Sequence, residues 1–161
     1  MIWSGDITST WATLSSQIAS GLSAAATDWS WWTLDIGGFQ ADPTIWWSGN
    51  VDEEQYRELY VRWQQWAVFL PFFRNHGTRQ CNTQSAFTCD NEPWSYGNEH
   101  ILTIVGYINL RYQLAPYLKA VFKRFSQTGR TIMRPLYMDF GKTDPSIMEM
   151  TRVNSNITTQ Q

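Results

Sequence analysis

Three polar residues stand at the ends of predicted elements, and their spacing limits the architectures open to this chain. Asp6 precedes an amphipathic segment, Asp35 closes an aromatic and apolar run, and His76 follows a second apolar run. The intervals between them are 29 and 41 residues. A strand–helix unit of an eight-stranded parallel barrel takes about 31 residues, and such barrels carry functional side chains at the carboxyl ends of successive strands. The spacing therefore predicts an α/β fold, a partial (β/α)8 TIM barrel with these residues on one rim.

The hydrophobic pattern supplies the helices and strands of these units. Apolar residues recur at helical spacing over 11–22, and the run 31–36 is typical of a buried strand. A second helical pattern over 59–70 overlaps the apolar stretch 68–73, and 80–97 is predicted as a long irregular loop. A third helix is expected over 99–125, kinked or divided at Pro116. Gly129 marks its end, and 131–140 is predicted as an extended strand.

The length of the chain sets the expected domain organisation. A complete barrel takes about 250 residues, whereas 161 residues hold only about three strand–helix units. A barrel that lacks the other units would leave its sheet edges unpaired. We therefore expect a fragment of a larger protein. Residues 1–129 would be the C-terminal part of the (β/α)8 domain, and 130–161 the incomplete start of a C-terminal β-sandwich domain or an exit linker.

Charge and hydropathy exclude several classes of partner. The chain has 12 Lys+Arg against 14 Asp+Glu, a formal net charge of −2, and no basic cluster. Neither nucleic acid nor an anionic membrane surface is therefore predicted as a partner. No apolar run approaches the roughly 20 residues of a membrane span. Two His and two Cys without ligand spacing predict no metal site. The oligomeric state stays open.

The remaining signals concern localisation. Cys81 and Cys89 flank a polar loop, and Asn156 begins a glycosylation sequon. Together they favour a secretory route, although no signal peptide is visible at the N-terminus. Free thiols and a disulfide are both open for the two cysteines.

Aromatic side chains make up 16% of the residues and include 10 Trp. One interpretation is a core rich in Trp, and Trp63 and Trp66, which share a helical face, are predicted to pack there. The other is a sugar site, because flat apolar rings stack on pyranose C–H faces while polar edges hold hydroxyls.

Three short segments carry a resemblance to a known family. Trp3-Ser4-Gly5-Asp6, Asp35-Ile36-Gly37-Gly38-Phe39 and Arg74-Asn75-His76-Gly77 resemble, in order and spacing, successive active-site motifs of glycoside hydrolase family 31. Segments 107–112, 114–117 and 133–136 are similar to the helix and barrel exit that follow in that family. The resemblance implies a retaining α-glucosidase or α-xylosidase that hydrolyses terminal α-linked glucose or xylose. It also implies a (β/α)8 barrel followed by C-terminal β-domains, and no cofactor.

The resemblance implies a catalytic role for one residue of this chain. Asp6 matches the general acid/base of the family. Retaining hydrolysis needs a second carboxylate as nucleophile, roughly 5–5.5 Å from the first. The family's nucleophile lies in an Asp–x–Asn–Glu motif, which does not occur in this sequence. We therefore expect the nucleophile to lie outside this chain and the isolated chain to be inactive.

Five further residues match substrate-binding positions of the family. Trp3 would wall the subsite that holds the glycone, the sugar ring on the non-reducing side of the scissile bond. Asp35 and His76 match residues that hydrogen-bond its hydroxyls. Phe39 matches an aromatic residue that flanks the pocket, and Arg74 would be a neighbour of His76.

Each of these residues also has a purely structural interpretation. Asp6 could cap the N-terminus of a helix. The segment from Asp35 to Gly38 could be a turn that uses glycine for positive φ. His76 could donate a hydrogen bond to a carbonyl. The alternative function is a non-catalytic carbohydrate-binding protein or a degenerate, truncated product.

Overall fold

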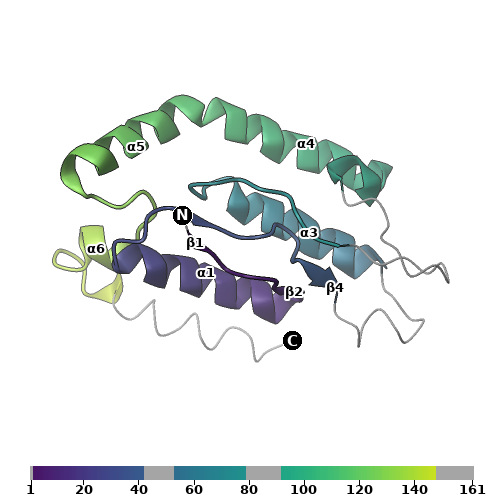
Figure 1. Cartoon of the computed structure of the whole chain (residues 1–161), viewed down its shortest axis with the longest axis horizontal. Helices are drawn as coiled ribbons and strands as arrows, with labels where there is room; N and C mark the ends of the chain where they lie inside the picture. Colours follow the sequence, from purple (N-terminus) through teal and green to yellow (C-terminus); the bar gives the residue numbers. More distant parts are fainter. Residues whose placement is uncertain (1, 42–52, 79–91, 148–161) are drawn as a thin grey trace.

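The computed structural model describes residues 2–41, 53–78 and 92–147 (Figure 1). The first half alternates short strands with long helices. The elements are β1 (Ile2–Trp3), β2 (Thr8–Ser9), α1 (Trp11–Ala26), β3 (Trp32–Thr33), β4 (Gln40–Ala41) and α3 (Glu53–Ala67). The second half is helical, with the 3₁₀ helix η1 (Pro93–Tyr96), α4 (Asn98–Gln113), α5 (Ala115–Thr128) and the single turn α6 (Leu136–Phe140).

Three chain segments run parallel and side by side. Ile2 of β1 pairs with Trp32 of β3, and just after β3 Ile36 forms a parallel bridge with Asn75. Further along, β2 pairs in parallel with β4, and Gln40 bridges Thr78. α1 connects the first segment to the second, and α3 connects the second to the third. The alternation of strands and helices predicted from the sequence is confirmed.

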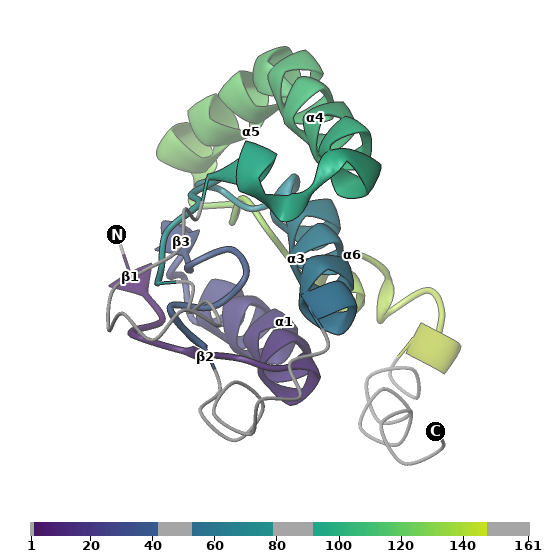
Figure 2. The same cartoon turned by 90° about the vertical axis from the view of Figure 1, so that its right-hand side faces the viewer.

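The hydrophobic core lies between the strands and the two connecting helices. Alternate residues of a strand point to opposite faces, so Trp32, Leu34 and Ile36 share one face. This face packs with Leu14 of α1 and Trp63 of α3. Trp63 is fully buried, as predicted, and Trp66 packs partly buried against the same cluster. Figure 2 shows the strands beside α1, with α3 on the far side of that helix from β1.

The long third helix is divided as the sequence predicts. α4 ends at Gln113 and α5 begins at Ala115, directly before Pro116, so the two are successive segments along one side of the molecule (Figure 1). α5 ends at Thr128 and is capped by Gly129, which adopts the left-handed conformation, φ 72°. α4 packs on α3 and η1. No helix within the described ranges is long and apolar enough to cross a membrane.

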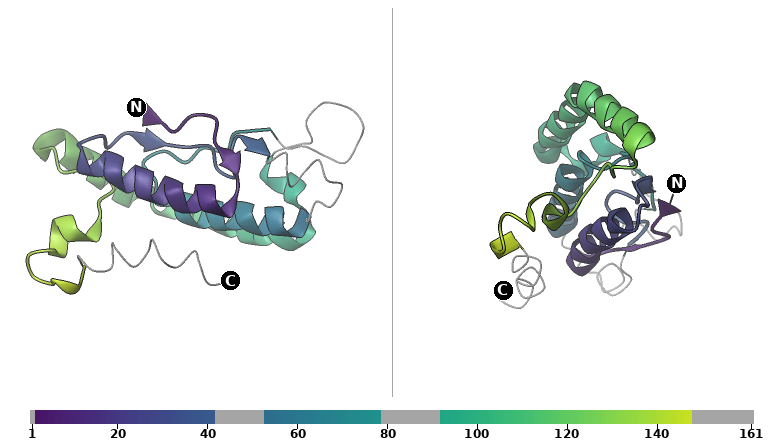
Figure 3. Two further views of the ribbon diagram at one scale, coloured as in Figure 1. Left: turned by 90° about the horizontal axis from the view of Figure 1, so that it is seen from below. Right: turned by 90° about the vertical axis from the view of Figure 1, so that its left-hand side faces the viewer.

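The extended strand predicted over 131–140 is wrong. Residues 136–140 form α6, which follows Pro135 and lies near one end of α1 in Figure 3. The turn is stabilised because Asp139 accepts hydrogen bonds from Arg130, at 2.5 Å, and from Arg134, at 3.0 Å. Between 92 and 147 the described chain contains no strand, so a C-terminal β-domain is not observed here. The division into 1–129 and 130–161 stays a prediction.

Several sequence predictions concern residues that the structure does not describe. Cys81, Cys89 and Asn156 lie outside the described residues. Most of the predicted loop 80–97 does too, and its last part forms η1.

Candidate active site

Trp3, Asp35 and Arg74 meet where three parallel segments end. The Trp3 indole donates a hydrogen bond of 3.1 Å to Asp35 Oδ1, and the Arg74 guanidinium binds the same oxygen. Arg74 also lies over the Trp3 ring, with its central carbon 5.5 Å from the ring centroid. Residues 32 and 39 positions apart in sequence are thus brought into direct contact. The sequence predicted all three as site residues.

The two oxygens of Asp35 differ in their surroundings. Asp35 is 0% exposed, and its Oδ2 is buried without a hydrogen-bond partner in the described structure. Trp3 beside it is 42% exposed. A buried carboxylate oxygen without a donor is energetically costly, so it is a strong acceptor for a hydroxyl or amide brought by a ligand. The ring and the carboxylate together offer an apolar face and a polar edge.

The segments that follow these strand ends lie against one another. The Ile7 carbonyl accepts hydrogen bonds from the amides of Phe39, at 2.7 Å, and Gln40, at 3.0 Å. The Phe39 carbonyl in turn accepts the Thr78 amide at 2.7 Å. This close packing requires Gly38: φ there is +86°, and a Cβ would stand 2.8 Å from backbone atoms of Ser9. The motifs that begin at Asp35 and Arg74 therefore share one rim with the segment that follows Asp6.

Asp6 itself is exposed on the segment between β1 and β2. It is not the cap of α1, because Thr10 occupies that position and its side chain accepts the Thr13 amide at 3.0 Å. The capping interpretation of Asp6 is therefore wrong. Across the described ranges, no hydrogen bond or ion pair engages its carboxylate, which leaves both oxygens available.

Phe39 and His76 form a second pair on the rim. Their ring centroids are 5.4 Å apart, and the planes are tilted by 43°. His76 is exposed, and in the part of the chain that the structure describes its imidazole donates to no carbonyl. The structural interpretation of His76 as a carbonyl-bound imidazole is not supported, and its ring nitrogens are available to a ligand.

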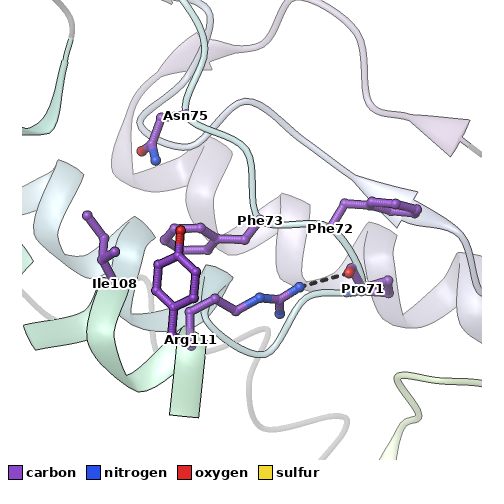
Figure 4. Close-up of a pocket in the computed structure, with 7 residues that line it drawn as sticks. Pro71, Phe72, Phe73, Asn75, Ile108 and Arg111 are labelled. Carbon is purple, nitrogen blue, oxygen red and sulfur yellow. Dashed lines mark hydrogen bonds between the residues drawn. The ribbon is translucent and has the colours of Figure 1, made fainter. Parts of the chain in front are cut away.

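Sequence reasoning missed Arg111 and the cavity beside it. The cavity, about 500 Å³, lies between residues 71–75 and α4, and none of the predicted site residues lines it. It is lined by Pro71, Phe72, Phe73, Asn75, Ile108, Arg111 and Tyr112 (Figure 4). The Arg111 guanidinium donates to the carbonyls of Val68, Leu70 and Pro71 and so fastens α4 to the turn after α3. Arg111 lies in the segment 107–112 that resembles the family, but the sequence indicated no role for it, because its partners are backbone carbonyls.

The described residues contain no group of three His, Cys, Asp or Glu side chains that could hold a metal ion. The site offers hydrogen-bonding and proton-transfer groups on a partly apolar surface.

Comparison with known proteins gives a consistent result. The family model of the glycosyl hydrolases family 31 TIM-barrel domain matches residues 1–121. The chain is 65% identical over 161 residues to alpha-xylosidase A of Aspergillus niger, covering 100% of this chain and 22% of that protein. It is 41% identical over 138 residues to an alpha-xylosidase of Saccharolobus solfataricus, covering 86% of this chain and 17% of the relative. Neutral alpha-glucosidase C of Homo sapiens is 35% identical over 139 residues, which are 86% of this chain and 13% of that protein.

Solved structures show the same similarity. A xylosidase from Aspergillus niger superposes with a TM-score of 0.86 at 64% identity, covering 100% of this chain and 22% of the other. A GH31 alpha-xylosidase from a soil metagenome, complexed with xylose, gives a TM-score of 0.77 at 35% identity and covers 91% of this chain and 22% of the other. The chain thus spans about a fifth of the length of these relatives.

Proposed function

This chain belongs to glycoside hydrolase family 31, and we propose that it forms the acid/base-bearing rim of a retaining α-glycosidase that hydrolyses terminal α-linked xylose or glucose. The observation that carries the proposal is the buried Asp35 Oδ2 without a partner, beside the half-exposed ring of Trp3. A sugar is the ligand class that matches this combination, because its hydroxyls donate hydrogen bonds while its C–H face stacks on an aromatic ring.

Recognition of the glycone would centre on Asp35. One of its oxygens is held by Trp3 and Arg74, so the carboxylate cannot rotate freely, and the other would accept a hydrogen bond from a sugar hydroxyl. Hydrogen bonds to a charged acceptor contribute about 1.5–3 kcal/mol each. His76, supported by Phe39, would bind a second hydroxyl at the neighbouring strand end.

Asp6 would act as general acid and then as general base. In the first step its carboxyl group protonates the leaving oxygen while a second carboxylate attacks the anomeric carbon, and in the second step it deprotonates the water that releases the sugar. The exposed position of Asp6 and the absence of bonds to it among the described residues support this role. The nucleophile would come from a segment outside these 161 residues, since the sequence lacks the family's Asp–x–Asn–Glu motif.

Similarity favours xylose as the glycone. The two named α-xylosidases are 65% and 41% identical to this chain, against 35% for neutral alpha-glucosidase C. Glucose differs from xylose only by the hydroxymethyl group on the fifth ring carbon. The walls around that group would decide between them.

A hydrolysis assay of the purified chain tests the assignment of the nucleophile. We expect no turnover of aryl α-xylosides or aryl α-glucosides by the 161-residue chain. Hydrolysis that disappears in Asp6→Ala would show that the chain contains its own nucleophile, which would contradict the proposal on that point. Binding of methyl α-xyloside by titration calorimetry or NMR tests recognition. We expect Asp35→Asn to weaken it roughly 10- to 100-fold, the weight of one hydrogen bond to a charged group.

A chimaera tests the role of Asp6. This chain would replace the corresponding segment of the Aspergillus niger xylosidase, to which it is 64% identical in structure-based comparison. Asp6→Asn should abolish hydrolysis of substrates with poor leaving groups, whereas activated aryl groups should still be released in the first step, because they leave without protonation. The glycosyl-enzyme should then accumulate, since the base of the second step is missing. Equal losses on both substrate types would contradict the acid role. Sugar binding by the chain with an inactive chimaera would instead favour the non-catalytic carbohydrate-binding alternative.

A further inference from the structure

Asn75 lies between two site residues and points away from both. Alternation along an extended segment places its side chain on the face opposite Arg74 and His76, towards α3. Its Oδ1 accepts a hydrogen bond of 2.6 Å from the Tyr60 hydroxyl and a second one from the Gln64 amide. Tyr60 and Gln64 are both fully buried and lie one helical turn apart on α3. The backbone that carries Arg74 and His76 is thus anchored in the core.

The ring of Tyr60 also touches the neighbouring strand end. A Cβ added to Gly37 would stand 2.6 Å from Tyr60 Cδ2, so the ring lies directly on the backbone of the turn that follows Asp35. Tyr60 therefore contacts both strand ends of the site, through its ring on one side and its hydroxyl on the other. In the described chain, α3 is the helix that connects these two strands.

The position of Tyr60 is itself fixed by a second ring. Tyr96 of η1 stacks on Tyr60 with centroids 3.7 Å apart and planes inclined by 12°. The hydroxyl of Tyr56, one turn earlier on α3, lies 3.4 Å from that of Tyr96. Burial raises the pKa of the Tyr60 phenol, so its hydroxyl stays a hydrogen-bond donor throughout the working pH range of an enzyme.

The ion pair on the solvent side does not provide comparable rigidity. The Arg74 side chain is 39% exposed, and pairs that involve a half-exposed, long side chain contribute little and leave that chain mobile. The Asn75 oxygen, by contrast, is held by two fully buried donors, Tyr60 and Gln64. Backbone pairing, in which the Ile36 amide donates to the Arg74 carbonyl at 3.2 Å, sets the register between these segments, and the contacts on the helix side hold it in place.

We propose that Tyr60, assisted by Gln64, is the positioning residue of the site: it holds Gly37 and Asn75 so that the free oxygen of Asp35 and the His76 ring face one sugar in a fixed geometry. That the ligand is a sugar rests on the proposed function, whereas the positioning of Asp35 against Trp3 and Arg74 is independent of it. Removal of the Tyr60 hydroxyl should loosen the strand end without emptying the core, because the ring remains.

The test compares Tyr60→Phe with Tyr56→Phe in the 161-residue chain. Both changes remove one buried phenol oxygen from α3, but only Tyr60 binds Asn75. The Trp3 indole N–H, which donates to Asp35, is the spectroscopic reporter, and its ¹H–¹⁵N resonance is assigned from the Trp3→Phe variant. We expect Tyr60→Phe to shift or broaden this resonance and to weaken methyl α-xyloside binding about tenfold. Tyr56→Phe, which leaves the hydrogen bond from Tyr60 to Asn75 in place, should have a clearly smaller effect on both.

An unchanged indole resonance in folded Tyr60→Phe would overturn the proposal, as would equal effects of the two variants. If the unaltered chain binds neither α-xyloside nor α-glucoside, the proposed sugar recognition is wrong for this chain. The indole resonance still tests the positioning role of Tyr60 in that case. If Tyr60→Phe does not fold, Gln64→Met removes the other donor to Asn75, and the same shift is expected. Failure of both variants to fold would assign the network to stability alone and would also overturn the proposal.

Discussion

Replacement of Arg111 by Met should lower the free energy of unfolding by more than its partly exposed position on α4 suggests. The guanidinium donates to three carbonyls, those of Val68 at 2.8 Å, Leu70 at 2.5 Å and Pro71 at 2.9 Å. The residues that carry these carbonyls are buried, and burial also lowers the pKa of Arg111, which nevertheless stays cationic. A buried acceptor left without a donor costs about 1–3 kcal/mol.

Two structural features set the expected total. Three acceptors would give as much as about 9 kcal/mol if none regained a partner. The cavity of about 500 Å³ beside Arg111 admits water, which would satisfy part of them. Met also removes the guanidinium from above the Phe73 ring, where its central carbon lies 5.9 Å from the ring centroid. We therefore expect a loss of about 3–5 kcal/mol, which is a large fraction of the 5–15 kcal/mol typical of a domain.

Urea unfolding followed by tryptophan fluorescence measures the loss, with the free energy extrapolated to water. Arg62→Met is the matched control, because its pair with Glu58 is 53% exposed on both sides and should contribute less than about 0.5 kcal/mol. Arg111→Lys keeps the charge but cannot reach three carbonyls, so it should fall between the two. A loss below about 1 kcal/mol for Arg111→Met would refute the reasoning, because the carbonyls would then not depend on it.

Three further changes have defined outcomes. Because the folded pKa of Tyr60 is raised above its ordinary value of 10.0, the contribution of Tyr60 to stability should be constant below pH 10 and fall above it in alkaline unfolding, and Tyr60→Phe should lack this part of the fall. Arg134 and Arg130 lower the pKa of Asp139, so its contribution is present above its ordinary value of 3.8 and lost at lower pH. Asp139→Asn should therefore reduce the melting temperature at pH 7 and not at pH 2. Gly38→Ala places a methyl group 2.8 Å from the Ser9 backbone at φ +86° and should cost about 3 kcal/mol or more in urea unfolding.

Part of the site was predictable because it depends on positions at strand ends. Parallel strands joined by helices bring their carboxyl ends to one edge, so spacing predicted Asp6, Asp35 and His76 on one rim, and the family resemblance added Arg74 as a neighbour of His76. The contact between Arg74 and Asp35 was not predicted. The capping interpretation of Asp6 was excluded only when Thr10 was found at the start of α1. The prediction of a strand over 131–140 was wrong because the ion pairs of Asp139 stabilise a helical turn, which the β-branched and aromatic pattern did not predict.

Periodicity, proline geometry and local motifs are properties of short segments, so the strand–helix units, the division of the long helix at Pro116 and the residues of the candidate site could be predicted from the order of the residues. Which of those residues are in contact, and which groups hold them in place, depends on the tertiary structure. The unpaired oxygen of Asp35, the double contact of Tyr60 and the three carbonyls of Arg111 are relations between distant segments. Their partners include backbone atoms and buried faces, which leave no pattern in the order of the residues.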